Sequence, residues 1–131
     1  MNKQAIIDSI NKSLSHDPAA KRACLHIYDY LLTCEADNLK YITFNNLREI
    51  SSANDSVLFK AINYLTGQSL NLLSIGYEYI SGNEIYTLTE EDIDSILTDD
   101  VLYLDGYPVN DWKEKTFIFF YASKELEPPL K

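Results

Sequence analysis

The stretch TFNNLREISSANDSVLFKAINYLTG, residues 43–67, decides how this chain folds. Its apolar residues recur at helical spacing over residues 44–50 and again over residues 55–66, with a polar segment between them. Thr43 and Asn54 stand immediately before the two apolar stripes, and their side-chain oxygens can accept hydrogen bonds from the unpaired amides of a first helical turn. The stretch therefore predicts a short helix, a tight turn and a longer helix.

Further elements are predicted on both sides of this stretch. Apolar stripes predict the helices, β-rich runs beside turn residues predict the strands, and Gly67 is expected to end its helix in the left-handed conformation. The expected fold class is α+β. The predicted elements are a helix over residues 3–14, a helix over 18–35, an extended piece at 41–42, a hairpin over 70–89, a helix over 90–97 and strands over 101–104, 107–109 and 117–121.

Between residues 18 and 89, the order of the predicted elements resembles that of the winged-helix superfamily. The order is helix, short strand, helix, turn, helix and hairpin. This resemblance implies a three-helix core with a β-hairpin wing, whose third helix and wing often bind duplex DNA and in many relatives bind proteins instead. We expect one domain over residues 1–131, in which the winged-helix core follows an N-terminal helical arm (1–17) and precedes a C-terminal helix and strands (90–127) and a tail (128–131).

Helix 55–66 is the candidate DNA-reading element. Opposite its apolar stripe it presents Ser56, Lys60 and Asn63, and Arg48 lies on the preceding helix. Asn can recognise adenine and Lys can recognise guanine at base edges in the major groove. These four residues are the candidate DNA contacts of one interpretation, in which the chain is a dimeric, sequence-specific transcriptional regulator.

The charge distribution favours a protein partner over DNA. The chain has a formal net charge of −9. Residues 1–75 hold seven acidic and seven basic side chains, whereas residues 76–114 hold eleven acidic and one basic. A DNA-binding wing needs cations near phosphate groups, so acidic side chains around the predicted hairpin oppose nucleic-acid binding. We therefore expect a non-enzymatic protein-interaction or accessory subunit of a larger complex.

Tyrosine-rich strands and acidic side chains in the C-terminal half form the candidate protein interface. Tyr offers a large contact area with a polar tip, although strands also use Tyr for packing over their own core. Acidic residues at a helix start also favour the helix dipole without any ligand, and their spacing does not match a calcium loop. The candidate interface residues are Tyr77, Tyr79, Tyr86, Glu90, Glu91, Asp94, Tyr103 and Trp112.

No segment indicates catalysis, a cofactor or membrane insertion. The sequence lacks a Gly-x-Ser-x-Gly motif, a His-Glu-x-x-His motif and a glycine-rich phosphate loop, so we expect neither an enzyme nor a bound metal or cofactor. No apolar run has the length of a signal peptide or a membrane span, which predicts a cytoplasmic protein. The apolar stripe of the N-terminal arm, which contains Ile6 and Ile10, either packs on its own core or exchanges with a second copy in a homodimer.

Overall fold

A computed structural model describes residues 2–67 and 70–123 of the chain. It has a mixed α+β fold with a small antiparallel sheet, as the sequence predicts. The chain forms two compact units. The first unit contains the described residues up to Ile75 and from Phe120 onward, and the second unit contains residues 76–119.

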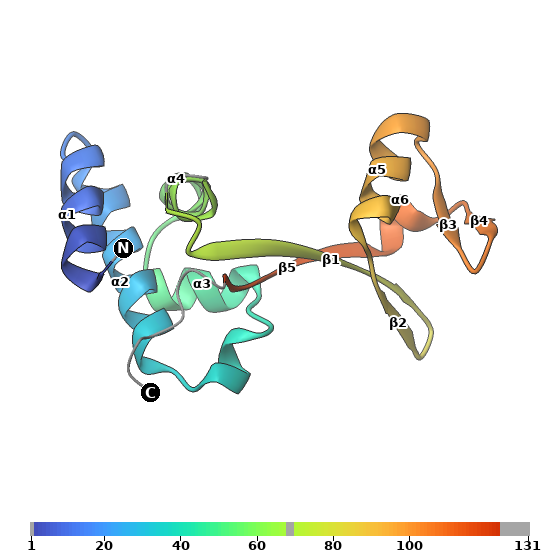
Figure 1. Ribbon diagram of the computed structural model, residues 1–131, viewed down its shortest axis with the longest axis horizontal. Helices are drawn as coiled ribbons and strands as arrows, with labels where there is room; N and C mark the ends of the chain where they lie inside the picture. Colours follow the sequence, from blue (N-terminus) through green and yellow to red (C-terminus); the bar gives the residue numbers. More distant parts are fainter. Residues whose placement is uncertain (1, 68–69, 124–131) are drawn as a thin grey trace. The chain divides into compact units, whose positions relative to one another are not determined.

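The described part of the first unit is built on four α-helices and one short 3-10 helix (Figure 1). The second α-helix contacts each of the other three, so it lies at the centre of this unit. Its buried side chains are Ala20, Ala23, Cys24, Ile27, Tyr28 and Leu31. The helices are α1 (Lys3–Ser13), α2 (Pro18–Thr33), η1 (Ala36–Leu39), α3 (Phe44–Ser51) and α4 (Asp55–Thr66).

The N-terminal helix α1 packs on the core of its own unit. Ile6 and Ile10 are buried in the same hydrophobic cluster as the buried side of α2. The Tyr64 hydroxyl on α4 donates a hydrogen bond to the carbonyl oxygen of Ser9 at 3.1 Å, which ties α1 to α4. The apolar stripe of the arm is therefore covered within one chain.

Side-chain caps begin α3 and α4 where the sequence predicts them. Thr43 Oγ1 accepts a hydrogen bond from the amide of Asn46, and Asn46 Oδ1 accepts one from the amide of Thr43, both at 3.0 Å. Asn54 Oδ1 accepts a hydrogen bond from the amide of Val57 at 2.9 Å. These bonds satisfy amides that have no partner inside the helix, so each helix begins immediately after its cap.

The prediction of a left-handed Gly67 is wrong. The backbone of Gly67 is extended, with φ −67° and ψ 161°. Its amide donates a hydrogen bond to the carbonyl oxygen of Tyr64 at 3.3 Å, and a Cβ atom at this position would lie 3.3 Å from the carbonyl oxygen of Asn63. The end of α4 is crowded, so the close approach of the backbone is what favours glycine here.

The predicted hairpin is present as the strands β1 (Leu73–Ser81) and β2 (Glu84–Thr87). Ser81 pairs with Glu84, which leaves a two-residue turn. Gly82 is the first residue of this turn and has a φ of 61°, a conformation that glycine adopts without strain. The turn residues therefore set the register of the hairpin.

A strand from the far end of the chain, β5 (Thr116–Ala122), is the other neighbour of β1. The sheet order is β2-β1-β5. The predicted extended piece also joins β5, because the amides of Ile42 and Phe120 each donate to the carbonyl oxygen of the other at 2.7 and 2.8 Å. The chain passes from the first unit to the second inside β1 and returns inside β5.

The second unit has a small core of its own, formed by Tyr79, Leu88 and Leu102. Asp105 and Gly106 both have positive φ, 53° and 85°, as a two-residue type I′ hairpin turn requires. The short helix after this hairpin is not predicted from the sequence, and the predicted tail lies outside the described residues. The further elements of this unit are α5 (Glu90–Asp99), β3 (Leu102–Leu104), β4 (Tyr107–Val109) and α6 (Trp112–Lys115).

Gly76 lies against the ring of Phe119, and both residues belong to the second unit. A Cβ atom built on Gly76 would overlap with ring atoms of Phe119. Phe119 is 8% exposed, so its ring has little room to move. A glycine inside a strand is therefore required here by the close approach of an aromatic side chain.

We expect Gly76→Ala to lower the free energy of unfolding by about 1–3 kcal/mol, because the added methyl group displaces the Phe119 ring. Urea unfolding followed by circular dichroism measures this loss. In a double-mutant cycle, most of the loss should disappear in a Phe119→Ala background. The same loss in both backgrounds would show that the ring is not its cause.

Candidate interaction surfaces

The outer sides of α3 and α4, called here the α3–α4 face, carry all four candidate DNA contacts. Ser56, Lys60 and Asn63 are exposed on α4, and Arg48 is partly exposed on α3. The buried side chains of α4 are Leu58, Ala61, Ile62 and Leu65. The polar face predicted for helix 55–66 is therefore confirmed.

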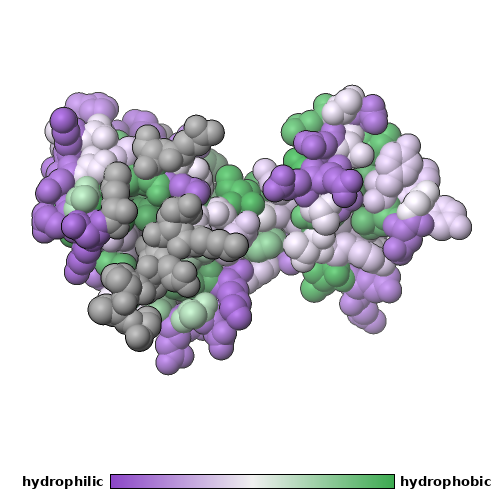
Figure 2. Space-filling model, in the orientation of Figure 1, coloured by the Kyte–Doolittle hydropathy of each residue, from purple (hydrophilic) through white to green (hydrophobic). Residues whose placement is uncertain are grey.

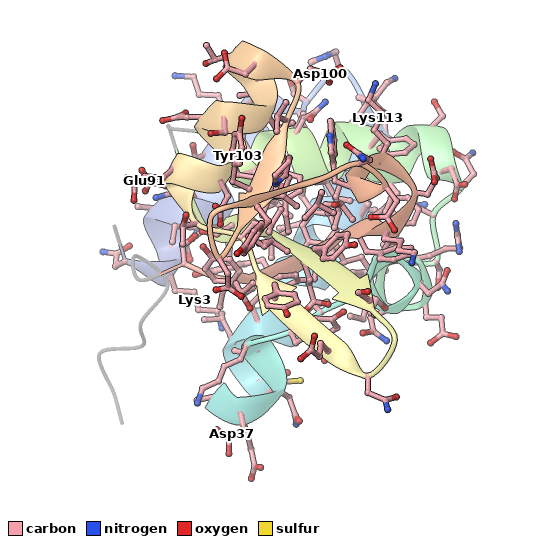
Figure 3. All side chains as sticks on the ribbon, turned by 90° about the vertical axis from the view of Figure 1, so that its right-hand side faces the viewer. Lys3, Asp37, Glu91, Asp100, Tyr103 and Lys113 are labelled. Carbon is pink, nitrogen blue, oxygen red and sulfur yellow. The ribbon has the colours of Figure 1, made fainter. Side chains whose placement is uncertain are left out.

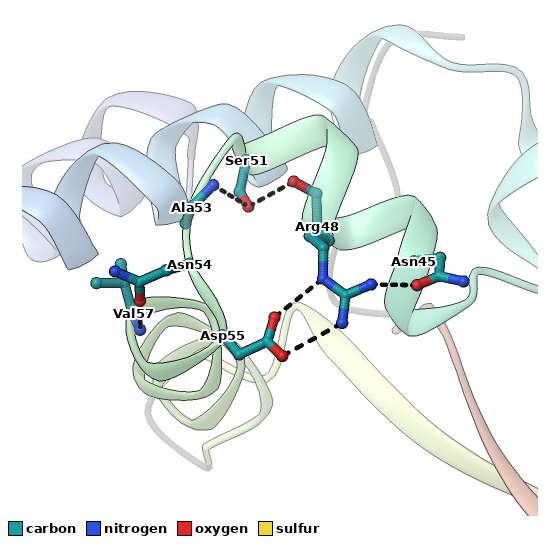
Figure 4. Close-up of polar contacts among 7 residues, drawn as sticks. All are labelled: Asn45, Arg48, Ser51, Ala53, Asn54, Asp55 and Val57. Carbon is teal, nitrogen blue, oxygen red and sulfur yellow. Dashed lines mark hydrogen bonds and ion pairs between the residues drawn. The ribbon is translucent and has the colours of Figure 1, made fainter.

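Arg48 is held by contacts within the α3–α4 face (Figure 4). Its Nε donates a hydrogen bond to Asp55 Oδ1 at 2.9 Å, and its Nη2 donates to Asp55 Oδ2 at 3.3 Å. Its Nη1 donates to Asn45 Oδ1, and the guanidinium carbon lies 5.0 Å from the centroid of the Phe44 ring. The hydrogen bonds between Arg48 and Asp55 raise the pKa of Arg48 and lower the pKa of Asp55. The guanidinium is thus fixed beside an opposite charge.

Lys60 is paired with the N-cap of α2. Its Nζ lies 3.2 Å from Asp17 Oδ2, and Asp17 Oδ1 accepts a hydrogen bond from the amide of Ala20 at 3.2 Å. The Ala20 amide, and after it the Lys60 ammonium, lowers the pKa of Asp17. Each of the two cations among the candidate DNA contacts is therefore beside a carboxylate. Lys60 and Asp17 are 43 positions apart, so no local pattern predicts their ion pair.

The α3–α4 face also has an aromatic part, which is not among the candidate residues predicted from the sequence. Phe59 is 56% exposed, and its ring centroid lies 5.2 Å from that of Phe44. Aromatic and arginine side chains are enriched at the centres of protein interfaces. A Phe on the polar side of an amphipathic helix is the signal that could have found this site.

Three of the candidate interface tyrosines pack inside the second unit. Tyr79 is 5% exposed and belongs to its buried cluster, so it is not part of an exposed surface in this structure. Tyr77 and Tyr86 are partly buried against the same cluster, and the rings of Tyr79 and Tyr86 are tilted with centroids 6.1 Å apart. These positions fit the alternative interpretation, in which strand tyrosines pack over their own core.

Two other aromatic candidates differ in exposure. Tyr103 on β3 is 48% exposed and lies on the surface. Trp112 is partly buried against the core of the second unit, and its Nε1 donates a hydrogen bond to the carbonyl oxygen of Asp100 at 3.4 Å. Tyr107, which is not among the predicted interface residues, is 74% exposed on β4. The exposed aromatic surface of this unit therefore differs from the predicted set.

A hydrogen-bonded group joins β1 to α6 in the second unit. The Tyr79 hydroxyl donates to Asp111 Oδ1 at 2.6 Å, and Lys115 Nζ lies 3.1 Å from Asp111 Oδ2. The hydrogen bond from Tyr79, and after it the one from Lys115, lowers the pKa of Asp111. The same bond to Asp111 raises the pKa of Tyr79. The buried tyrosine therefore holds the carboxylate in its charged form.

Helix α5 carries the three acidic candidates, Glu90, Glu91 and Asp94, and all three are exposed. Figure 3 shows the side chain of Glu91 near the start of α5 and that of Asp100 just after its end. Asp92 has a different role, because its Oδ2 accepts a hydrogen bond from the amide of Thr89 at 2.8 Å. The helix therefore begins with a capping box formed by Thr89 and Asp92, and it presents its other acidic candidates to solvent.

The second unit carries the whole net charge of the chain. Residues 76–119 contain eleven acidic and two basic side chains, which gives −9, the charge of the complete sequence. Both cations have acidic partners within the unit. Lys113 Nζ lies 3.6 Å from Asp100 Oδ2, and Lys115 is bound to Asp111.

Two further observations concern metals and membranes. Among residues 2–67 and 70–123, no three His, Cys, Asp or Glu side chains come together as a group that could hold a metal ion. Within the same ranges, no helix combines the length and the apolar character that crossing a membrane demands.

Comparison of the chain with protein-family models, with curated proteins and with solved structures gave no match.

Acid is expected to weaken the Tyr79–Asp111–Lys115 group. The folded-state pKa of Asp111 lies below its unfolded value of about 3.9, so the stabilisation is complete above that pH and is lost as the pH falls through the lowered pKa. We expect Asp111→Asn to lower the melting temperature at neutral pH and to flatten its decline below about pH 4. Circular dichroism melts across this range check the result, with the exposed Asp29→Asn as the control. If the melting temperature falls equally steeply with decreasing pH in Asp111→Asn and in the wild type, this prediction is contradicted.

Proposed function

We propose that this chain is a non-enzymatic winged-helix protein that acts as a protein-interaction or accessory subunit of a larger complex. The observation that carries the proposal is the pairing of both cations on the α3–α4 face. Arg48 is bound by Asp55 and Lys60 is paired with Asp17, so the face that would approach DNA has no uncompensated cation among its candidate contacts.

The order of elements from α2 to the β1–β2 hairpin supports the winged-helix part of the proposal. Helix α2, the extended residue Ile42, α3, α4 and the β1–β2 hairpin follow one another as in that fold. Capped helices on both sides of a tight turn fit the same arrangement. The strand β5 between β1 and Ile42 is an addition to the expected pattern.

The chemistry of phosphate binding explains why paired cations argue against DNA. Nonspecific affinity for DNA comes from lysines and arginines that replace counterions around the phosphates. An Arg that forms a two-pronged bond with Asp55 has its charge and part of its donors already satisfied, which weakens any contact with a phosphate. Asp55 and Asp17 also repel the phosphates themselves. The second unit, with its net charge of −9, adds further repulsion.

The exposed aromatic part of the α3–α4 face supports a protein partner. Phe44 lies beside the fixed guanidinium of Arg48, and the ring of Phe59 packs against that of Phe44. A side chain that is already ordered loses little conformational entropy on binding, so such a group favours a stable contact with another protein. Phe59 offers the apolar area that such a contact would bury.

One observation favours the competing function, a dimeric DNA-binding regulator. Ser56, Lys60 and Asn63 are all exposed on α4, where they could reach base edges once the pair between Lys60 and Asp17 opens. Direct measurement of DNA binding decides between the two functions.

We expect the full-length chain to bind a mixed-sequence duplex more weakly than about 1 μM at low salt. The variant Asp17→Asn/Asp55→Asn frees Lys60 and Arg48, and Asn still caps α2, so this variant should bind the duplex more tightly. The control Asp29→Asn/Glu49→Gln removes two exposed acids of the same unit that have no part in the ion pairs. Fluorescence anisotropy over a salt series measures both. Sub-micromolar binding by the wild type with a steep salt dependence, lost in Arg48→Ala/Lys60→Ala, would establish the DNA-binding function instead.

Capture of partners by the tagged full-length chain tests the protein-interaction function directly. After nuclease treatment and cross-linking, mass spectrometry should find one protein in near-stoichiometric amount, and Phe59→Ser or a charge variant of α5 should reduce its yield. Recovery of no protein above a tag-only control would contradict the proposal.

A further inference from the structure

The outer side of α5 is an exposed helix face centred on an apolar residue. Leu97 is 77% exposed, and it lies seven residues after Glu90 and three after Asp94. These spacings place the three side chains on one side of a helix. Ile93 and Ile96 point the other way, because they pack against the core of the second unit. We call Glu90, Asp94 and Leu97 the α5 face.

Leu97 is the most exposed large hydrophobic side chain in the described part of the chain. Single exposed apolar residues are common, but this one is flanked by exposed acids on the same helix. Figure 2 shows hydrophobic and hydrophilic residues side by side over α5. An apolar residue within a charged rim is the usual anatomy of a protein interface.

The stability of α5 itself explains its charges only in part. Acids in the first turn favour the helix dipole, but the last turn contains Asp99 and no basic residue, which is unfavourable. Glu90 and Asp94 are four residues apart, a spacing at which like charges on a helix repel. The repulsion between Glu90 and Asp94 therefore offsets part of what Glu90 contributes in the first turn.

The cations of the second unit do not relieve this repulsion. Lys113 and Lys115 are the two basic residues in 76–119, and they pair with Asp100 and Asp111. The α5 face therefore keeps a net negative charge. A partner that supplies cations here would remove the repulsion as it binds.

We propose that the α5 face binds a basic, amphipathic helical segment of a protein partner. Lysine or arginine side chains of that segment lie opposite Glu90 and Asp94, and an apolar side chain packs against Leu97. This inference rests on the proposed protein-interaction function and names the chemistry of its partner. Attraction between the basic side chains and the two acids speeds association, and burial of Leu97 against the partner slows dissociation.

A protein segment fits this face better than a second copy of the chain. The first unit has equal numbers of acidic and basic residues, and the second unit is strongly acidic, so another copy offers little complementary charge. Electrostatic complementarity therefore points to a basic partner, with self-association as an outcome of the test.

The experiment uses a fluorescent synthetic helix with one leucine stripe bordered by lysines, and a scrambled peptide of the same composition. We expect the full-length chain to bind the amphipathic peptide several-fold more tightly than the scrambled one. Glu90→Gln/Asp94→Asn should weaken binding by roughly fivefold, because two charge pairs are lost. Leu97→Ser should weaken it by roughly tenfold, because an apolar contact is lost. Fluorescence anisotropy measures each affinity.

Asp29→Asn/Glu49→Gln is the matched control, because it removes the same charge from exposed helix positions in the first unit. It should change the affinity less than twofold if the α5 face is the site. Equal losses in the control and in Glu90→Gln/Asp94→Asn, or equal binding of the scrambled peptide, would show attraction to net charge alone and would overturn the proposal. Concentration-dependent self-association that Leu97→Ser abolishes would overturn it in favour of a second copy.

A measurement without any ligand tests the stability argument. Asp94→Asn, which leaves the acids of the first turn in place, should raise the melting temperature of the free chain by about 1–2 °C, because the like-charge repulsion from Glu90 is removed. A lower melting temperature would show that Asp94 supports the fold, and it would contradict the proposal.

Failure of this inference and failure of the proposed function are distinguishable. If the captured partner binds the wild type, Glu90→Gln/Asp94→Asn and Leu97→Ser equally well, the α5 face is not the site, while the protein-interaction function stands. If the wild type binds duplex DNA tightly and captures no protein, the proposed function fails, whatever the peptide does.

Discussion

Burial of one side of α2 is the interaction on which the rest of the first unit depends. Ile27 and Leu31 on this side are 0% and 1% exposed. A fully buried aliphatic side chain of this size contributes about 1.5–3 kcal/mol relative to an exposed one, so the two together stabilise the unit by several kcal/mol. Because α1, α3 and α4 all contact α2, the direction of their outer side chains is set by how they cover it. The positions of Arg48 and Lys60 follow from that packing.

The two units differ in which of their charged side chains are paired. In the first unit, carboxylates on neighbouring elements neutralise the cations of the α3–α4 face, and exposed pairs of this kind contribute little to stability. In the second unit, the few cations are used inside the fold and the acids of α5 are left facing solvent. One surface is therefore nearly neutral and aromatic, and the other is acidic with a protruding leucine. Both compositions are better suited to protein contact than to phosphate binding.

Local signals in the sequence predict much of the fold. Thr43, Asn54 and Thr89 cap helices through bonds to residues three positions away, so their effect can be read from the sequence. The two-residue turn that begins at Gly82 likewise fixes the register between two strands that follow one another in the sequence. The left-handed Gly67 was predicted from the same kind of signal, but crowding at the end of α4 overrides it.

Contacts between distant parts of the chain could not be predicted in this way. The neighbouring positions of β1 and β5, and the pair between Lys60 and Asp17, join residues about 40 positions apart and leave no periodic pattern. Alternation predicts that Tyr77 and Tyr79 share a strand face, but burial of Tyr79 depends on Leu88 and Leu102, which come from elsewhere in the unit. For the candidate site, the sequence therefore identifies the exposed acids of α5 and the polar side of α4, and it misses Phe59, Leu97 and the ion pairs.

The contact between Gly76 and Phe119 also bears on the order of folding. These two residues are the first and last of the second unit, so folding of that unit brings its ends together. Pairing β1 with β5 in an otherwise unfolded chain would close a loop of about 40 residues, at an entropic cost of about 3 kcal/mol. A second unit that has already folded removes most of this cost, so the parts of β1 and β5 that belong to the first unit, residues 73–75 and 120–122, come together faster. By holding β1 and β5 close together, the folded second unit lowers the entropic cost of forming the first unit.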